Sequence, residues 1–427
     1  MSSLLIQGGH VISPADGLNG LFDVLVEDGL IREVGPQLTR RADRIIDARG
    51  HIVAPGFIDL HVHLREPGGE ESETIETGLA AAVAGGFTAV CPMPNTSPVN
   101  DRPEAVRRLV ERAGEIGLAR VFPIAAVSVG SAGEVLTDFS TLVAAEAVAF
   151  SDDGRPVKTA GLMRKAMEAA KALGVPVIEH CEDASLSAGG VINEGVVAGK
   201  LGVKGIPAAS EEVCLARDIV LAEATGAHLH VAHLSTTGSV ELVRAARRRG
   251  VRVTAEVTPH HFVLTDEAVL QRGANAKMNP PLRGARDLEA LLTGLAEGNI
   301  DAIATDHAPH APWLKAKPLG EAPFGVTGLE TALGLAMTYL VHAGRISIGD
   351  LVTLLTVNPA RIINRPLGRV AMGSAADITA FDPEREWTYR VAESRSKSRN
   401  SPFDGWKLKG CVMATVVAGK VVYERTS

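Results

Sequence analysis

The middle of the chain repeats one unit, an apolar strand-like run followed by a helix-like stretch or by a loop that leads to one. Eight such runs can be counted. Near-continuous apolar strands that alternate with helices indicate a parallel sheet covered on both faces. Eight repeats over roughly 300 residues favour a (β/α)8 TIM-type barrel over an open, doubly wound sheet. The runs are 51–64, 87–92, 120–127, 147–151, 175–181, 228–234, 252–260 and 301–307.

The segments between and after these runs agree with an α/β fold. Segments 162–173, 211–225 and 240–249 are rich in alanine and amphipathic, which is typical of helices that cover a sheet. Further helical runs are expected near 327–342 and 350–364. No glycine-rich phosphate fingerprint follows the first strand-like run, which argues against a dinucleotide-binding fold.

Both ends of the chain differ from the middle. Short β-type runs broken by turn residues fill the first fifty positions, and similar runs return at 376–381, 412–417 and 421–423. We therefore expect a small β-sandwich domain assembled from both termini. A length of 427 residues accommodates this domain beside one barrel. The predicted boundaries are 1–54 with 366–427 for the sandwich and 55–365 for the barrel.

Composition excludes several classes of function. A net charge of −7 offers no basic surface for nucleic acid. No stretch approaches the ~18 apolar residues of a membrane span, and the N-terminus has no signal-peptide pattern. The four cysteines are scattered and form no CxxC pair, which favours a reducing compartment. We expect a soluble, cytoplasmic enzyme that acts on a small molecule.

Histidine or aspartate closes five of the eight strand-like runs. The carboxyl ends of barrel strands form the active-site face, so these residues should converge although they lie far apart in sequence. A lone His-x-His pair is more often incidental than functional, but its coincidence with the other polar strand ends favours a metal centre. The residues are His61 and His63 in the first run, Asp152 and Asp153 in the fourth, His180 in the fifth, His233 in the sixth and Asp306 in the eighth.

The kinds of side chain in this group suit zinc. His61 and His63 face the same side of a strand because side chains alternate. Neutral imidazole and carboxylate bind zinc at ~2.0–2.2 Å. Four histidines and two aspartates exceed what one tetrahedral ion needs, whereas two ions that share a carboxylate and a hydroxide would use them all. Strand parity cannot decide between Asp152 and Asp153 as the shared carboxylate.

Other polar residues near the strand ends are predicted to hold a substrate. Arg65 follows the histidine pair, where its guanidinium could grip a carboxylate with two hydrogen bonds. Asn95 and Asn279 lie in proline-stiffened loops, and each offers a donor and an acceptor. His310 follows Asp306 closely enough to reach the same pocket. These groups suit a small anionic amide.

Several motifs resemble those of one known family. The opening PGFIDLHVHLR at 55–65 resembles the amidohydrolase superfamily in general. The more particular motifs resemble the bacterial type-I dihydroorotases, and the resemblance runs the whole length of the chain. They are REPG at 65–68, PMPNT at 92–96, FSDDG at 150–154, KMNPPLR at 277–283, TDHAPH at 305–310, APFGVTGLE at 322–330, SPFDGW at 401–406 and GKVVY at 419–423.

This resemblance implies a role for each candidate residue. His61 and His63 would bind one Zn²⁺ and His180 and His233 the second, with Asp153 and a hydroxide as bridges. Asp306 would complete the first ion's shell and act as acid and base. Relatives in the wider superfamily use a carboxylated lysine where this chain has SDDG, so an aspartate bridge is expected. The implied substrate-binding residues are His63, Arg65, Asn95, Asn279, His310, Phe324 and Gly325.

The implied activity is the reversible, zinc-dependent hydrolysis of (S)-dihydroorotate to N-carbamoyl-L-aspartate, in pyrimidine biosynthesis. The resemblance also implies a homodimer and leaves open an association with aspartate transcarbamoylase. Two alternatives remain. A hydantoinase or allantoinase would share the barrel and the metal pair but lack the loops around Arg65, Asn95 and Asn279. An inactive scaffold for the transcarbamoylase should have lost ligands, and all six are present.

Overall fold

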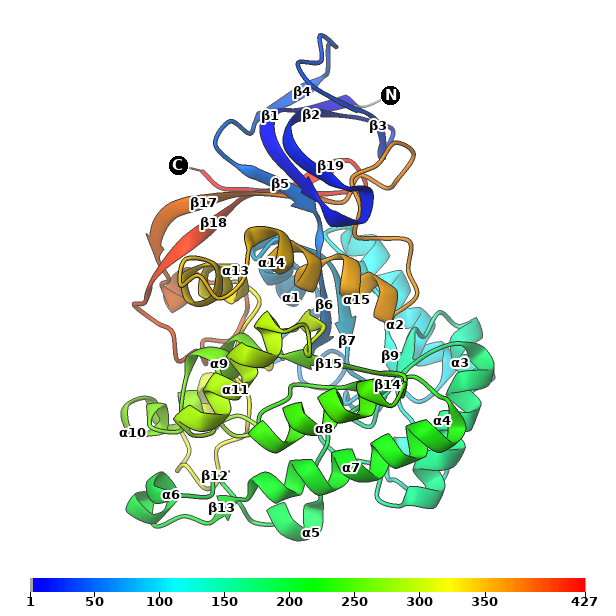
Figure 1. The fold of residues 1–427 in the computed structure, drawn as a ribbon, viewed down its shortest axis with the longest axis vertical. Helices are drawn as coiled ribbons and strands as arrows, with labels where there is room; N and C mark the ends of the chain where they lie inside the picture. Colours follow the sequence, from blue (N-terminus) through cyan, green and yellow to red (C-terminus); the bar gives the residue numbers. More distant parts are fainter. Residues whose placement is uncertain (1–2, 427) are drawn as a thin grey trace.

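Strands from both termini pair in one sheet at one end of the molecule (Figure 1). The computed structural model describes residues 3–426, so positions 1, 2 and 427 of the predicted terminal domain lie outside the described residues. The order is β19-β18-β17-β5-β1-β2-β3, with β4 also paired to β1. The strands are β1 (Ser3–Ser13), β2 (Leu18–Glu27), β3 (Leu30–Gly35), β4 (Arg44–Asp47), β5 (Ile52–Pro55), β17 (Ile378–Thr388), β18 (Lys407–Val417) and β19 (Lys420–Glu424).

The parallel strands that follow hold the polar strand ends. They form two sheets, β6-β7-β8 and β9-β10-β11-β14-β15-β16, and β8 and β9 fall within the single predicted run 120–127. A parallel bridge joins Val62 to His307, and the amide of His63 donates to the carbonyl of His307 at 2.8 Å. The first and last strands are therefore neighbours. The strands are β6 (Phe57–Val62), β7 (Phe87–Pro92), β8 (Arg120–Val121), β9 (Ile124–Ala125), β10 (Ala149–Phe150), β11 (Val177–Glu179), β14 (Leu229–Val231), β15 (Val253–Val257) and β16 (Ala302–Ile303).

The first strand-like run, 51–64, is two strands rather than the one that was predicted. Its first half is β5, which pairs with β17 in the terminal sheet, and its second half is β6. The break falls at Gly56, where a Cβ atom would collide with the side chain of Thr88. Continuous apolar sequence hides this change of sheet, because both halves are buried.

Helices cover the parallel strands, and α4, α7 and α8 lie side by side over them in Figure 1. Helix α4 begins where Thr159 accepts a hydrogen bond from the amide of Leu162, and it ends at Gly174 in a left-handed conformation. The helices are α1 (Ile75–Ala84), α2 (Pro103–Ile116), α3 (Phe139–Ala144), α4 (Ala160–Leu173), α5 (Ala184–Ser187), α6 (Val196–Leu201), α7 (Ala208–Thr225), α8 (Thr237–Arg248), α9 (Pro259–Val263), α10 (Ala268–Arg272), α11 (Ala285–Ala296), α12 (Pro312–Lys315), α13 (Ala332–Ala336), α14 (Ile348–Leu355) and α15 (Val357–Ile362).

Two of the predicted helices are interrupted. The expected run 327–342 forms α13 and then a π-helical turn, Met337–Val341. The run 350–364 is divided between α14 and α15 at Thr356, whose φ of −133° is not helical. A further short pair, β12 (Ile192–Asn193) and β13 (Gly205–Ile206), lies outside the main sheets. Within residues 3–426, no helix has the length and apolar character needed to cross a bilayer.

Asp59 fastens the first parallel strand to the last. Its buried carboxylate accepts hydrogen bonds from the amide of Thr305 at 3.0 Å and the hydroxyl of Thr305 at 2.6 Å. It also accepts from the amide of His61 at 3.1 Å. Because Thr305 precedes Asp306, this carboxylate fixes two candidate ligands relative to one another.

Candidate metal centre

The six predicted ligands come from five different strand ends and meet in one buried cluster. Each follows or closes a parallel strand, so the chain leaves the sheet where the polar side chain begins. All six are at most 6% exposed, which puts ionisable groups where only a partner or a metal can offset their burial. They are His61, His63, Asp153, His180, His233 and Asp306.

Asp153 lies at the centre of the four histidines. Its Oδ1 atom is 3.3 Å from Nε2 of His61, 3.7 Å from Nδ1 of His180 and 3.7 Å from Nε2 of His233. Its Oδ2 atom is 3.6 Å from Nε2 of His63. Oδ1 thus faces His61 and the second histidine pair while Oδ2 faces His63, so this one carboxylate contacts all four histidines.

Asp306 lies against the first histidine pair. Its Oδ1 atom is 3.0 Å from Nε2 of His63 and 3.6 Å from Nε2 of His61. Burial by itself would raise the pKa of Asp306, but the adjacent imidazoles of His61 and His63 lower it well below its usual range. The group is therefore an ionised carboxylate, able to bind a cation or accept a proton.

Unpartnered atoms within the cluster show that its residues fit metal ions. Buried polar atoms are nearly always hydrogen-bonded. Yet His61 Nε2 and Asp153 Oδ1, which face one another in the cluster, have no hydrogen-bond partner among the described residues. Ligand atoms of one tetrahedral zinc ion lie roughly 3.3 Å apart, given bonds of ~2.0–2.1 Å. The separations of 3.0–3.7 Å between these side chains match that spacing.

The adjacent residue Asp152 has a different environment. It accepts hydrogen bonds from the amide and hydroxyl of Ser128, the amide at 3.1 Å, and so is directed away from the histidines. Lys158, the nearest lysine along the chain, is exposed. The contacts of the two side chains therefore distinguish Asp153, which faces the histidines, from Asp152, which does not. Strand parity could not make this distinction.

Three residues of the site have left-handed backbone conformations. The φ angles are 32° at His233, 46° at Asp306 and 60° at Arg65. Such conformations are uncommon for residues with a Cβ atom, cost of order 1–3 kcal/mol each and tend to occur at functional sites. Their recurrence at the turns after three different strands supports a functional role for this face.

A buried carboxylate that sequence reasoning missed orients the first histidine. Glu256 on β15 accepts from Nδ1 of His61 at 3.1 Å and from Nε2 of His230 at 3.1 Å. Burial would raise its pKa, but these two hydrogen bonds lower the pKa of Glu256 to about 2. The bond to Nδ1 leaves Nε2 of His61 free to face Asp153. A glutamate inside an apolar strand must have a partner, and that was the available signal.

A second missed carboxylate lies beside His180. Glu182 Oε2 is 2.9 Å from Nε2 of His180, and Nδ2 of Asn279 donates to the same oxygen at 2.7 Å. Burial would raise the pKa of Glu182, but the hydrogen bond with His180 brings it down to about 2. The structure thus places Asn279, a predicted substrate residue, against a candidate ligand.

The other predicted substrate residues surround the first histidine pair. Asn95 Oδ1 is 2.9 Å from Nδ1 of His63, and its Nδ2 donates to Oδ2 of Asp153 at 3.2 Å. Arg65 Nε donates to the carbonyl of Pro309 at 3.1 Å, and its Nη2 is 3.3 Å from Nε2 of His310. The guanidinium therefore lies at the rim of the cluster and supplies positive charge there.

Two lysines hold the loop that carries Phe324 and Gly325. Lys315 Nζ donates to the carbonyls of Pro323 and Gly325, each at 2.9 Å. Lys277 Nζ donates to the carbonyl of Ala322 at 2.6 Å and lies 4.3 Å above the ring of Phe324. Nε2 of His310 is 2.6 Å from the carbonyl of Phe324, which brings these predicted residues together. Gly325 has a φ of 122°, and a Cβ atom there would press on Ala308.

Histidines that were given no metal role have other surroundings. His307 Nε2 is 3.2 Å from the buried carboxylate of Glu73. His260 is buried, and its Nε2 has no partner among residues 3–426. Burial lowers the pKa of His260 to about 4, which keeps it neutral beside the cluster.

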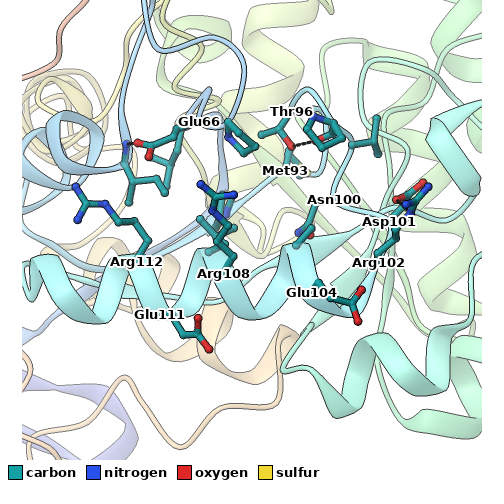
Figure 2. Close-up of a pocket in the computed structure, with 18 of the residues that line it drawn as sticks. Glu66, Met93, Thr96, Asn100, Asp101, Arg102, Glu104, Arg108, Glu111 and Arg112 are labelled. Atoms are coloured by element: carbon teal, nitrogen blue, oxygen red, sulfur yellow. Dashed lines mark hydrogen bonds and ion pairs between the residues drawn. The ribbon is translucent and has the colours of Figure 1, made fainter.

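A cavity of about 940 Å³ lies beside the cluster rather than over it (Figure 2). Figure 2 shows Arg108 and Arg112 rising from α2 beneath Glu66 and Thr96. None of the six candidate ligands lines the cavity. Leu64 and Met93 contribute to its wall, so it borders the loops after β6 and β7, and neither His63 nor Asn95 lines it. The candidate site is therefore identified by its cluster of histidines and aspartates and not by this cavity.

The chain is similar in sequence to known proteins over its whole length. A family model described as dihydro-orotase-like matches residues 50–239. A dihydroorotase from Pelotomaculum thermopropionicum is 52% identical over 421 residues, which cover 99% of this chain and 98% of that protein. A dihydroorotase from Geobacter sp. (strain M21) is 50% identical over 423 residues, covering 99% of each.

Solved structures of hydantoinases resemble the fold. L-hydantoinase (dihydropyrimidinase) from Arthrobacter aurescens has a TM-score of 0.90 at 26% identity, covering 100% of this chain and 97% of that chain. D-hydantoinase (dihydropyrimidinase) from Thermus sp. has a TM-score of 0.82 at 28% identity, covering 99% and 97%. Identity is thus much higher to the relatives named dihydroorotase than to these hydantoinases.

Proposed function

The chain belongs to the dihydroorotase family of metal-dependent cyclic amidohydrolases, and from this premise we propose how its residues open and close the ring of (S)-dihydroorotate. Identity of about half of all positions over the full length to proteins named dihydroorotase carries the assignment. The product of hydrolysis is N-carbamoyl-L-aspartate, and the reverse cyclisation serves pyrimidine biosynthesis.

The proposed scaffold is a closed (β/α)8 barrel over 55–365 with a β-sandwich formed by 1–54 and 366–427. The bridge between Val62 and His307 supports closure, because it joins the first parallel strand to the last. The pairing of β5 with β17 supports a domain shared by both termini. The TIM barrel of the related amidohydrolases agrees with the first point.

We propose that the cluster holds two zinc ions. His61, His63 and Asp306 would bind the first, and His180 and His233 the second, with Asp153 between them. When bound, the ions would lower the pKa of a shared water and polarise the carbonyl that is attacked. Glu256 would fix the tautomer and orientation of His61, and Glu182 would do the same for His180. Because Asp153 supplies the bridge, the site should need no carboxylated lysine.

Asp306 is the proposed acid and base. The oxygen of the attacking water forms a bond to the carbonyl carbon of the ring amide, and Asp306 takes the proton that this oxygen releases. The bond from that carbon to the ring nitrogen then breaks, and Asp306 gives the proton to the nitrogen. Its lowered pKa means that the carboxylate is ionised, with an oxygen available to accept a proton, before the substrate arrives.

The substrate carboxylate would be held at the rim of the cluster. We propose that Arg65, Asn95 and His310 contact it, that Asn279 and His63 contact the ring, and that the backbone of Phe324 and Gly325 closes over it. The cation of Arg65 beside the neutral ring of His310 supports this arrangement. Burial, followed by the charge of Arg65, lowers the pKa of His310 to about 3. The one N–H of a neutral His310 is on Nε2, which lies 2.6 Å from the carbonyl of Phe324, so His310 would donate to the substrate carboxylate in exchange for that bond.

Incubation of the zinc-loaded protein with dihydroorotate, hydantoin and allantoin in parallel tests this function. We expect ring opening of dihydroorotate and little or none of the other two. Hydantoin is the serious competitor, because hydantoinases share the fold. Opening of hydantoin or allantoin with dihydroorotate untouched would overturn the proposal. A homodimer, an aspartate transcarbamoylase partner and a cytoplasmic location stay predictions.

A further inference from the structure

A segment near the C-terminus crosses the loops that surround the proposed substrate site. In residues 394–400, which we call the strap, side chains alternate between buried and more exposed. Alternation of this kind is typical of an extended chain with one face against the protein. The outward side chains are Arg395, Lys397 and Arg399, and the inward ones are Ser394, Ser396, Ser398 and Asn400.

The inward serines fasten the strap to the barrel loops. The hydroxyl of Ser394 donates to Glu330, and that of Ser396 donates to the buried Glu73. The hydroxyl of Ser398 donates to the carbonyl of Ser72 at 2.6 Å. These contacts fix the strap along the outside of the site before it reaches Asn400.

Asn400 uses its side chain and its backbone to tie two loops together. Its Nδ2 atom donates to the carbonyls of Ala308 and Gly325, each at 3.0 Å. Its Oδ1 atom accepts from the amide of His310 at 3.0 Å, and its carbonyl accepts from the amide of Thr327 at 2.9 Å. The side chain is 3% exposed, so these hydrogen bonds have little competition from water.

We propose that Asn400 is a positioning residue for substrate binding, holding His310 and Gly325 at the spacing that the substrate carboxylate and ring require. This inference rests on the proposed function, which gives His310 and Gly325 their contacts with substrate. Asn400 itself touches neither the substrate nor the candidate ligands. It acts through the loop that follows Asp306 and the loop that contains Phe324.

Only a primary amide of this length satisfies all three side-chain contacts. Its nitrogen provides two donors for two carbonyls, and its oxygen provides the acceptor for one amide. Aspartate has the same shape but would direct a carboxylate oxygen at the carbonyls of Ala308 and Gly325. Serine is too short to span both loops. The arrangement therefore explains the asparagine that precedes the SPFDGW motif at 401–406.

Asp306 should be less affected than His310 and Gly325. Thr305, directly before Asp306, is held separately by the carboxylate of Asp59 at 2.6 and 3.0 Å. A change at Asn400 therefore loosens the substrate side of the loop while the proton-transfer side keeps its anchor. The expected result is a change in KM larger than the change in kcat.

The test compares Asn400→Asp with the wild type and with Ser398→Ala. The control removes one hydrogen bond of the same strap, to Ser72, and leaves all the bonds from Asn400 to the two substrate loops in place. For Asn400→Asp we expect KM for dihydroorotate to rise about tenfold or more and kcat to change less than about threefold. Zinc content should be unchanged, and Ser398→Ala should keep the wild-type KM. Asn400→Ser provides the same comparison if the aspartate variant does not fold.

Hydrogen exchange of the metal-free protein supplies a readout that needs no turnover. Amides of His310, Gly325 and Thr327 should exchange about tenfold faster or more in the Asn400 variants, because their loops lose shared bonds. An unchanged KM together with unchanged exchange would overturn the inference, as would a loss confined to kcat. If the wild type fails to open dihydroorotate, the proposed function is wrong, and the exchange rates alone then decide whether Asn400 positions these loops.

Discussion

Replacing Glu256 by glutamine tests whether the cluster is a metal site whose ligands are oriented by the residues around them. The carboxylate is fully buried and lies 3.1 Å from Nδ1 of His61 and 3.1 Å from Nε2 of His230. Glutamine has nearly the same shape but carries no charge, so it can accept from only one of these imidazoles. Two charge-assisted hydrogen bonds then become one neutral bond and one mismatched contact.

The magnitude follows from the kind of bond that is lost. A hydrogen bond to a charged group contributes about 1.5–3 kcal/mol and a neutral one about 1 kcal/mol. The difference at His61 is therefore about 0.5–2 kcal/mol, with an added cost from the mismatch at His230. Replacing a residue that hydrogen-bonds to a metal ligand typically weakens metal affinity by about 10–100-fold, which is about 1.4–2.8 kcal/mol. We expect Glu256→Gln to weaken zinc binding within that range.

The assay is a competition titration of metal-free protein against a fluorescent zinc chelator. Glu330→Gln is the matched control, because Glu330 also accepts hydrogen bonds, from Ser394 and the amide of Arg395, but contacts no candidate ligand. Its zinc affinity should equal that of the wild type. Wild-type affinity in Glu256→Gln would refute the claim that Glu256 orients His61 for a metal.

Three further predictions concern proton transfer, substrate binding and stability. Asp306→Asn should lower turnover of dihydroorotate about 10²–10⁴-fold with zinc content nearly intact; wild-type-like turnover would remove its role as acid and base. Arg65→Lys keeps the charge but loses the planar fork, so KM for dihydroorotate should rise about tenfold or more in steady-state assays while kcat changes little; an unchanged KM would contradict the contact. Burial lowers the pKa of His228 to about 3, so between pH 6.5 and 3 the unfolded chain binds the extra proton and stability falls as pH falls. Relative to pH 8, the wild type should lose about 2 kcal/mol more than His228→Gln by pH 5 in denaturant titrations; parallel losses in the two proteins would contradict the assignment.

Much of the fold was predictable because buried parallel strands and amphipathic helices have different hydrophobic periods. Every strand of the two sheets β6-β7-β8 and β9-β10-β11-β14-β15-β16 falls within one of the eight predicted runs. The runs 51–64 and 120–127 were exceptions in detail, because each continues through two sheets. In the run 51–64 the break falls at Gly56, which packs on Thr88, and the strand pairings on either side of it join residues far apart in sequence.

The candidate ligands were predictable because parallel strands deliver their carboxyl ends to one face. Strand alternation is enough to pair His61 with His63. It is not enough at Asp152 and Asp153, which follow the short strand β10 and belong to a turn. There the choice depends on a contact with Ser128, which alternation does not describe.

The residues that orient the ligands were harder to predict. Glu256 and Glu182 act through hydrogen bonds between different strands and loops, and no local spacing marks them. Asn400 is a further case, since it reaches the site from beyond the barrel, more than seventy positions after Gly325 in the chain. A buried glutamate in an apolar strand was a usable signal, whereas the asparagine gave none.

Recovery of activity as zinc is added to the metal-free protein tests the central claim most directly. The measurement follows dihydroorotate turnover against equivalents of zinc in buffer free of carbon dioxide and bicarbonate. An aspartate-bridged pair predicts activity that saturates at two equivalents per chain and does not increase when bicarbonate is added. Saturation at one equivalent, or a requirement for bicarbonate, would contradict a two-ion site bridged by Asp153.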